Sequence, residues 1–245
     1  QFGTQLKFGT YDNYGMNKDE LIDLLIFKSS KEDKYVTLKE YVERMKEDQK
    51  DIYYATGETI EAIKELPQLE KVLDKGYEVL YFTDNVDEFM ANIIGNYSDK
   101  PFKSLLQGDL DLDTKEEKEE VEKKANDNKD LLATLKEELK DKVSDVKLST
   151  RLKTSPVCLV SDDGISINMA KTLNAMNQGN IQANKFLEIN PDHELFKALA
   201  KVYETNKDLS EYANLLYDQA LLIAGLTVED PLAYTKRVSD LMLKA

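Results

Sequence analysis

Few residues of this chain have side chains that could serve as a nucleophile, a general base or a soft metal ligand. The sequence contains one cysteine, Cys158, and one histidine, His193. A serine or cysteine nucleophile activated by an imidazole would therefore have to use His193. A single thiol excludes a disulfide within the chain, and a zinc site of clustered thiolates and imidazoles needs more such ligands than the sequence holds. We expect no metal site and no catalytic residues.

The surroundings of these two residues favour structural roles. Cys158 lies between Val157 and Leu159, which is typical of a small buried apolar side chain. His193 follows Asn190-Pro191 at the expected start of a helix, where a positive charge is unfavourable, so we interpret it as neutral and structural. The sequence has no phosphate-binding glycine loop and no nucleophile elbow. A hydrolase that uses His193 stays as a minor alternative.

Composition limits the classes of partner. The 245 residues include 33 Lys and Arg against 47 Asp and Glu, a net charge of −14. Nucleic acids and anionic membranes bind cationic surfaces, so neither is expected as a partner. The longest apolar run, Ala220–Leu226, is too short to cross a membrane, and the start at Gln1 resembles no signal peptide. We expect a helix-rich fragment of a longer cytoplasmic protein.

The first half of the chain predicts a small α/β domain over residues 1–107. Capping-box patterns at Asn17 with Glu20 and at Thr37 with Glu40 predict two helix starts, the first helix running to about Phe27. Strands are expected at 51–56 and 77–82, separated by a helical stretch that breaks at Pro67 and ends at Gly76. This spacing is that of a βαβ unit, which predicts parallel pairing. A helix over 85–94 and an edge strand over 102–106 complete the domain.

The second half predicts a charged connection followed by an α+β domain. Residues 108–128 are expected to form a charged linker or helix start, and residues 129–245 the second domain. The spacing of Val121, Ala125, Asn128, Leu132, Leu135 and Leu139 predicts one long charged helix with a narrow apolar seam. Strands are expected at 146–149, 157–160 and 186–189, and helices at 165–176, 192–204, 210–224 and 231–243. Asn190 is the expected N-cap of the helix at 192–204.

Two short helices carry apolar stripes that could be either core or surface. Ile165, Met169, Leu173 and Met176 recur at steps of 4, 4 and 3 among polar residues. Spacing alone favours a core position, whereas the polar setting and the methionines suit an adaptable binding surface. Phe89 and Met90, with Ile93 and Ile94, form the second stripe, for which a core position is the simpler interpretation.

The last two helices carry more apolar residues than a small domain readily buries. This favours a four-helix contact between two copies of the chain, with an internal core as the alternative. The residues expected at this contact are Leu215, Leu216, Leu222, Ile223, Leu232, Tyr234, Val238, Leu241 and Met242.

Several segments resemble one family. Thr37–Met45 (TLKEYVERM) and Ile52–Gly57 (IYYATG) resemble the middle domain of the heat shock protein 90 chaperones. Arg151–Pro156 (RLKTSP), Glu188–His193 (EINPDH) and Leu216–Leu222 (LYDQALL) resemble the C-terminal domain of that family. The matches are collinear and cover essentially the whole chain, and the bacterial HtpG type is the closest fit.

The resemblance implies a chaperone fragment: the second half of the middle domain, a small α/β/α subdomain, followed by a mixed dimerisation domain whose helices form a dimeric four-helix bundle. It implies a cytoplasmic homodimer that binds non-native client proteins, with the bacterial seventy-kilodalton heat shock system as a candidate co-chaperone. The nucleotide-binding domain and its catalytic arginine loop would precede Gln1, so ATP and magnesium would belong to the full-length parent and this fragment would have no cofactor and no enzymatic activity. Neither Arg44, Arg151 nor Arg237 falls in that loop.

Carried over residue by residue, the client-contact positions, together with Met176 from the stripe, are Phe89, Met90, Asn92, Ile165, Met169, Leu173 and Met176. Two positions depart from the bacterial pattern, since Phe89 replaces the usual tryptophan and Thr172 stands where leucine is common. The alternative is a purely architectural dimerisation module, with client contacts made elsewhere in the parent protein.

Overall fold

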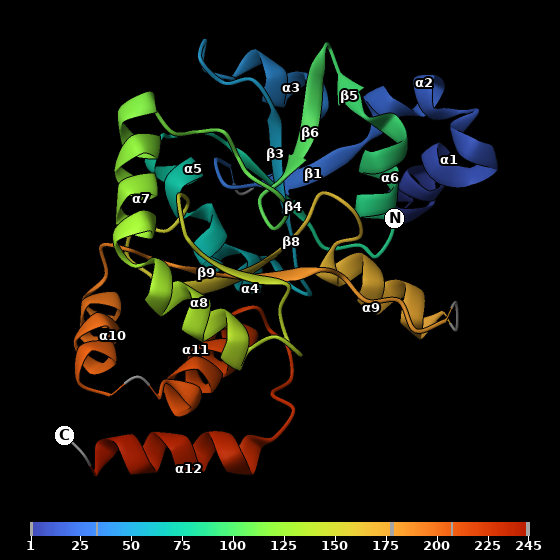
Figure 1. Cartoon of the computed structure of the whole chain (residues 1–245). Helices are drawn as coiled ribbons and strands as arrows, with labels where there is room; N and C mark the ends of the chain where they lie inside the picture. Colours follow the sequence, from blue (N-terminus) through green and yellow to red (C-terminus); the bar gives the residue numbers. More distant parts are fainter. Residues whose placement is uncertain (1, 33, 177–178, 207, 244–245) are drawn as a thin grey trace. The chain divides into compact units, whose positions relative to one another are not determined.

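The structure is a computed structural model that describes residues 2–32, 34–176, 179–206 and 208–243 (Figure 1). The chain forms two compact units whose segments alternate along the sequence. The first unit comprises residues 1–65, 71–110 and 165–183, and the second comprises 66–70, 111–164 and 184–245. The domain boundary expected near residue 107 stays a prediction.

The first unit is built on a six-stranded mixed sheet. Its strands are β1 (Ile26–Ser29), β2 (Val36–Thr37), β3 (Ile52–Thr56), β4 (Val79–Phe82), β5 (Asn96–Tyr97) and β6 (Lys100–Ser104), in the order β2-β1-β4-β3-β6-β5. β3 pairs in parallel with both β4 and β6, and the other pairs are antiparallel. The predicted parallel βαβ unit is therefore confirmed. The predicted edge position of β6 is wrong, because a tight turn through Ser98 and Asp99, both at positive φ, folds β5 back along its free side.

The helices of the first unit are α1 (Gly3–Gly15), α2 (Lys18–Leu21), α3 (Leu38–Glu43), α4 (Ile60–Lys64), α5 (Glu70–Asp74), α6 (Asp87–Ile94) and α9 (Ile167–Ala175), with the 3-10 turn η1 (Ile22–Leu24). The first residue of α5, Glu70, belongs to the second unit. The predicted capping box of α3 is confirmed: the backbone N–H of Glu40 donates to Thr37 Oγ1 at 3.2 Å, and that of Thr37 donates to Glu40 Oε2 at 2.8 Å. The predicted stop at Gly76 is also confirmed, since Gly76 has φ +69° and its N–H donates to Leu73 O at 2.8 Å.

The helix predicted from Asn17 begins where expected, since Asn17 is the N-cap residue of α2, but its predicted extent to Phe27 is wrong. The side chain of Asn17 makes no capping hydrogen bond, and the helical turns end at Leu24, which is exposed. Phe27 instead lies in β1, where it is buried and its ring packs 5.2 Å from that of Phe82. Burial alternates along β1, so the tertiary environment selects a strand over the weak helical pattern.

The core of the first unit surrounds Tyr41, whose side chain is completely buried. Its hydroxyl donates to Glu78 O at 2.6 Å and accepts from the backbone N–H of Tyr53 at 3.0 Å and from Gln49 Nε2 at 3.0 Å. Burial raises the pKa of Tyr41 well above its ordinary value. The phenol thus joins α3, β3 and β4 while staying neutral.

The second unit contains a three-stranded sheet of order β7-β9-β8, formed by β7 (Asp145–Leu148), β8 (Val157–Ser161) and β9 (Lys185–Ile189). β9 runs parallel to β7 and antiparallel to β8. All three strands were predicted. Its helices are α7 (Lys115–Asp127), α8 (Lys129–Glu138), α10 (Glu194–Thr205), α11 (Ser210–Ile223) and α12 (Pro231–Met242), with the 3-10 turn η2 (Pro67–Leu69).

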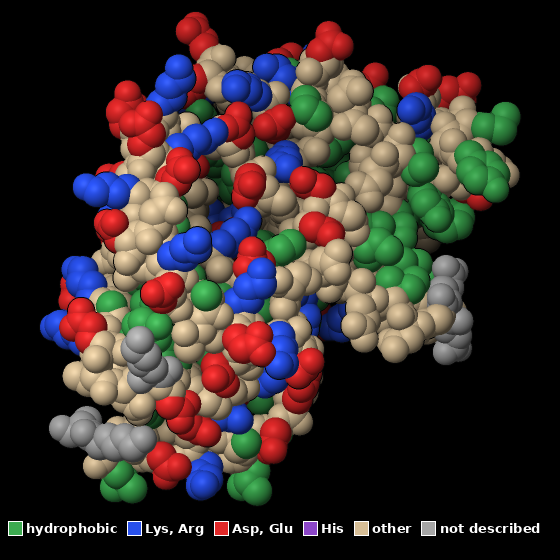
Figure 2. All heavy atoms as spheres, in the orientation of Figure 1, with side chains coloured by type: hydrophobic (Ala, Val, Ile, Leu, Met, Phe, Trp, Pro, Cys, Tyr) green, Lys and Arg blue, Asp and Glu red, His purple; other side chains and the backbone are tan. Residues whose placement is uncertain are grey.

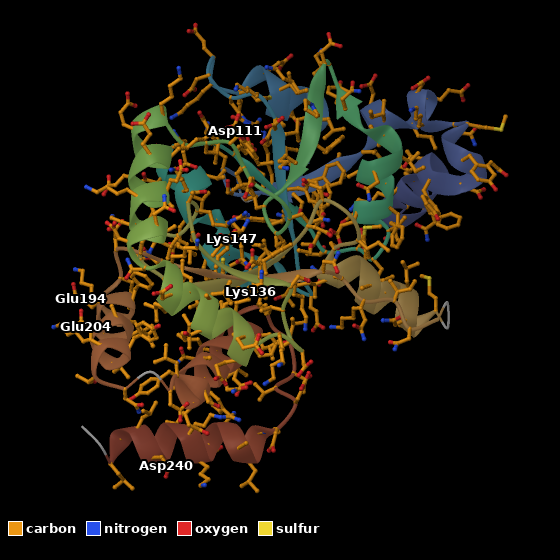
Figure 3. All side chains as sticks on the ribbon, in the orientation of Figure 1. Asp111, Lys136, Lys147, Glu194, Glu204 and Asp240 are labelled. Atoms are coloured by element: carbon orange, nitrogen blue, oxygen red, sulfur yellow. The ribbon has the colours of Figure 1, made fainter. Side chains whose placement is uncertain are left out.

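The predicted single long helix is two helices. α7 begins with a capping box at Thr114 and ends at Asn128, where the backbone leaves helical geometry and Asn128 Nδ2 donates to Lys124 O at 2.8 Å. α8 then buries Leu131 and Leu135, while its Lys136 forms an ion pair with Asp145 of β7 at 3.1 Å (Lys136 is labelled in Figure 3). α7 buries none of its described residues, so after the break only α8 turns leucines toward the core.

The predicted N-cap Asn190 is also wrong. α10 begins at Glu194, and His193 is its N-cap: the N–H of Leu195 donates to His193 Nδ1 at 3.1 Å. Asn190 Oδ1 instead accepts from the N–H of Asp192 at 3.0 Å and closes the preceding turn. This capping interaction gives His193 a structural role at the start of α10.

The buried centre of the second unit combines Cys158 with an ion pair. Cys158 is completely buried, as predicted, and burial raises the pKa of its thiol. Arg151 Nε lies 2.9 Å from Glu188 Oε2, and both side chains are almost entirely buried. Ser149 Oγ donates to the same Glu188 oxygen at 2.7 Å. Within the described part of the chain, no helix combines the length and apolarity that a membrane crossing requires.

Candidate functional site

The helix predicted over 165–176 is the shorter α9, which belongs to the first unit. Met169 and Leu173 of the predicted apolar stripe lie on α9, whereas Ile165 precedes its N-cap, Ser166, and Met176 is its C-cap residue. Ser166 caps this helix by accepting from the N–H of Met169 at 2.9 Å, and its hydroxyl donates to Glu88 Oε2 of α6 at 2.9 Å. A short serine therefore both starts α9 and attaches it to α6. The Ser166 hydroxyl accepts one hydrogen bond within α9 and donates another to α6, so the start of α9 is held in one orientation.

α9 docks on the first unit mainly through polar side chains. Asn168 Nδ2 donates to Thr56 Oγ1, and Lys171 Nζ pairs with Glu58 Oε1 at 2.6 Å. The Lys171–Glu58 pair is exposed, so it stabilises the contact only slightly. Most amphipathic helices bury their apolar stripe and expose their polar one. Of the described residues of α9 only Ala170 is buried, Met169 and Leu173 are half-buried, and the flanking Ile165 and Met176 stay exposed, so part of the stripe lies in solvent.

The predicted client-contact residues divide into exposed and buried positions. Ile165 and Met176 are 37% and 58% exposed, Asn92 is exposed, and Phe89, Met169 and Leu173 are half-buried. Asn92 Nδ2 lies 3.4 Å from Met169 Sδ, so α6 and α9 contribute to one surface, called here the α6–α9 surface (Phe89, Asn92, Ile165, Met169, Leu173 and Met176). Met90 is 0% exposed and belongs to the core cluster. It supports this surface from below and cannot contact a partner while the unit is folded.

Sequence reasoning missed the aromatic residues of α1. The ring of Tyr11 packs 5.7 Å from that of Phe89 in an edge-on arrangement, and the ring of Phe8 lies 6.3 Å from that of Tyr11. Phe8 and Tyr11 are 54% and 39% exposed. In Figure 2 hydrophobic side chains gather over α1 and continue toward α9. The three-residue spacing of Phe8 and Tyr11 on a helix was the available signal.

The predicted dimer residues lie on α11 and α12 of the second unit. Leu216 is buried, Leu215, Tyr234, Val238 and Leu241 are half-buried, and Leu222, Ile223, Leu232 and Met242 are exposed. None of the described residues of α12 is buried, and Leu232 is 81% exposed. Figure 3 shows the side chains along α12, where Asp240 is labelled.

α12 is attached to α11 by charge. Arg237 Nη1 binds Asp218 Oδ2 at 2.9 Å, and its Nε lies 3.3 Å from Glu211 Oε2. Asp218 is 3% exposed, and burial raises the pKa of its carboxyl despite the nearby cations Lys142 and Arg237. A buried aspartate thus fixes one side of α12, while Leu232 and Met242 stay without contacts that would bury them.

Among the described residues, no group of three or more His, Cys, Asp or Glu side chains is arranged to hold a metal ion. Carboxylates are abundant, but those of α7, such as Glu116 and Glu119, are exposed along one helix. Where carboxylates do converge in the first unit, at Asp84 and Asp87, the ammonium group of Lys7 lies 2.8 Å from both. Burial lowers the pKa of Lys7, but the two carboxylates raise it above its ordinary value.

Comparison with known proteins agrees with the resemblance seen in the sequence. The family model described as Hsp90 protein matches residues 1–245. Chaperone protein HtpG of Bacillus subtilis (strain 168) is 51% identical over 244 residues, covering 99% of this chain and 39% of the relative. Chaperone protein HtpG of Clostridium botulinum (strain Loch Maree / Type A3) is 53% identical over 243 residues, covering 98% of this chain and 39% of the relative.

The match is thus continuous along this chain but partial along its relatives, of which the chain spans about 39% in length. A family model that covers every residue, together with identities above 50%, shows the family. The chain therefore belongs to the Hsp90 family of chaperones, on its bacterial HtpG branch.

Proposed function

We propose that this chain joins two copies of its parent chaperone and binds non-native client proteins on the α6–α9 surface. The observation that supports client binding best is that α9 docks through Ser166, Asn168 and Lys171, which leaves Ile165 and Met176 in solvent. An exposed apolar surface that polar contacts hold in place is suited to weak, adaptable binding of partly folded chains.

The aromatic residues of α1 extend this proposed surface. Tyr11 contacts Phe89 directly, so Phe89 stands within a row of rings rather than alone. Phe89 occupies a position where the resemblance implies a tryptophan, and the neighbouring Phe8 and Tyr11 supply additional aromatic area. We expect the row to contribute client contacts that a single aromatic residue would otherwise make.

Client binding is tested by suppression of client aggregation, measured by light scattering with a thermally unfolding enzyme as the client. Met176→Asp introduces a charge at a residue that is 58% exposed, so the fold should tolerate it. We expect Met176→Asp combined with Met169→Asp to lower the suppression at least threefold. Asn180→Asp, at an exposed position that follows α9, adds one negative charge, as Met176→Asp alone does, and should leave suppression unchanged. Equal suppression by all these proteins would favour the purely architectural module.

Dimer formation is proposed at α11 and α12. The described residues leave Leu222, Leu232 and Met242 exposed, and a second copy would supply identical helices for a four-helix contact. Sedimentation equilibrium should give twice 28.0 kDa for the wild type. Leu222→Lys with Leu232→Lys should give the monomer mass, because two lysines facing their copies would be desolvated and would repel each other.

A matched control separates loss of the interface from a general effect of added charge. Ala198→Lys places a lysine at an exposed position of α10, in the same unit. This variant should sediment as a dimer. If the wild type is a monomer at all concentrations, α11 and α12 pack only within one chain, and the proposed dimer is wrong.

The remaining properties concern the longer relatives. We propose that ATP and magnesium are used by the part of the parent that this chain does not span, and that this chain alone hydrolyses no ATP. We also propose a cytoplasmic location and contact with the seventy-kilodalton heat shock system. An ATPase assay of the isolated chain tests the first statement: turnover above background that survives further purification would contradict it.

A further inference from the structure

A cavity opens at the carboxyl ends of β3 and β4 in the first unit. Its volume is about 290 Å³. The residues that line it follow the two strands or come from α6 and α9: Thr56, Gly57, Glu58, Phe82, Thr83, Asp84, Asn85, Glu88, Asn168, Lys171, Thr172 and Ala175. In sheets with parallel strands, ligands bind at this edge, because strand-to-helix loops converge there. The position of the cavity therefore resembles that of a ligand site.

The charges that line the cavity do not balance. Glu58 is paired with Lys171 at 2.6 Å, and Asp84 is paired with Lys7 at 2.8 Å. Glu88 also lines the cavity, and no ion pair among the described residues includes it. The cavity therefore carries excess negative charge whenever Glu88 is ionised.

Glu88 also lacks a hydrogen-bond donor for one oxygen. Its side chain is buried, with the residue only 5% exposed, and Oε2 accepts from Ser166 Oγ at 2.9 Å. Oε1 is buried without a donor from the described part of the chain. Ser166 cannot turn to serve it, because its oxygen also caps α9. A buried carboxylate oxygen without a donor is costly, which points to a donor from outside the chain.

We propose that this cavity binds a small molecule or side chain through an ammonium or guanidinium group that donates to Glu88 Oε1. A cationic nitrogen supplies both the missing positive charge and the missing N–H donor. The neutral lining groups of Asn85, Thr83 and Thr172 offer donors and acceptors to the rest of such a ligand. A volume of about 290 Å³ suits a short aliphatic amine or the end of an arginine or lysine side chain.

The test uses two probes that carry the same group. Agmatine represents a free guanidinium compound, and acetyl-Gly-Arg-Gly-amide represents a peptide side chain. Isothermal titration at pH 8 should give saturable binding of at least one probe, with a Kd of about 1 mM, as expected for a ligand of this size. N-butylurea, which has a similar shape without the charge, should bind at least tenfold more weakly.

Glu88→Gln should weaken binding of the better probe at least tenfold. Its amide oxygen can still accept from Ser166, so α9 should remain docked, which circular dichroism and hydrogen exchange of residues 165–176 would check. Glu61→Gln is the matched control, since Glu61 is an exposed glutamate of α4 that does not line the cavity. This variant should bind like the wild type.

A second variant keeps the proposal testable if Glu88→Gln fails to fold. Ala175→Leu narrows the cavity from its exposed side without removing a charge, and should weaken binding at least fivefold. Preference for agmatine would identify a free amine as the ligand class, and preference for the peptide would identify a protein side chain. The proposal would be overturned if neither probe saturated the protein at concentrations up to about 20 mM, well above the expected Kd. Unchanged binding by Glu88→Gln, or by a folded Ala175→Leu, would also overturn it.

Discussion

The buried pair of Arg151 and Glu188 gives the sharpest test of how the second unit is held together. The guanidinium binds the carboxylate through Nε at 2.9 Å and Nη2 at 3.2 Å, and both side chains are 2–3% exposed. The change to make is Arg151→Met, which keeps an unbranched apolar stem and removes the charged guanidinium group. We expect a large loss of stability, because the carboxylate would stay buried next to an apolar group.

The magnitude follows from what remains around Glu188 after the change. Ser149 Oγ would still donate at 2.7 Å, and Lys147 Nζ, 3.6 Å away and partly exposed, would be the nearest cation. Breaking a buried ion pair on one side costs about 3–5 kcal/mol, and the lysine should offset part of it, so we expect about 3 kcal/mol. Arg151→Met with Glu188→Gln removes both charges and should regain about half of that loss.

The assay is hydrogen exchange with mass spectrometry at increasing urea, because it reports on each unit separately. Peptides from β8 and β9 should lose protection in Arg151→Met at lower urea than in the wild type, while peptides from β3 and β4 should be unchanged. The double variant should lie between the two. A single variant within about 1 kcal/mol of the wild type would refute the reasoning, since desolvation of the carboxylate could not then be a large cost.

Further predictions concern the first unit and are tested by its unfolding midpoint in the same experiment. Thr37→Ala removes the capping box of α3 and should destabilise the unit by about 1 kcal/mol; Thr37→Ser, which keeps the acceptor, should not. Gly76→Ala places a side chain at φ +69° and close to Lys46, and should cost about 1–2 kcal/mol; equal stability would mean that the turn relaxes. Because burial raises the pKa of Glu88 from its ordinary value of 4.5 to about 7, the folded unit binds more protons than the unfolded chain between these values. This contribution to stability is fully present below about pH 4.5 and falls by up to about 3 kcal/mol as pH rises through 7, so Glu88→Gln should flatten that fall, and an equal slope in both proteins would contradict the assignment.

The features that the sequence predicted correctly depend on local rules. The capping box at Thr37 needs only two side chains three residues apart, and the stop at Gly76 needs only a residue that tolerates positive φ. The parallel pairing of β3 and β4 follows from the length of the connection between them. These features depend on residues that are close in sequence, so they form regardless of what packs around them.

The features that were missed depend on contacts between distant parts of the chain. Phe27 belongs to a strand because it packs against Phe82, which is remote in sequence. His193 replaces Asn190 as the cap of α10 because Asn190 is already used in the preceding turn and its Nδ2 donates to Ser155 O at 3.0 Å. The burial of Met90 follows from its place in the core of the first unit, whereas Phe89, one residue away, reaches Tyr11 at the surface. The spacing of apolar residues along the sequence cannot by itself predict that Met90 is buried in the core while Phe89 lies at the surface.

The polar docking of α9 connects the proposed client surface with the proposed ligand cavity. Lys171 and Asn168 of α9 line the cavity, and the exposed residues Ile165 and Met176 flank the two ends of the same helix. A cation bound at Glu88 would neutralise the buried carboxylate that Ser166 contacts, and would therefore strengthen the attachment of α9. If the ligand binds only when α9 is docked, binding and docking are coupled. The free energy by which the ligand stabilises docked α9 must then equal the free energy by which docking of α9 strengthens ligand binding. Agmatine should accordingly slow hydrogen exchange of residues 165–176 in the wild type and leave it unchanged in Glu88→Gln; binding without such protection would mean that the cavity and the client surface are independent.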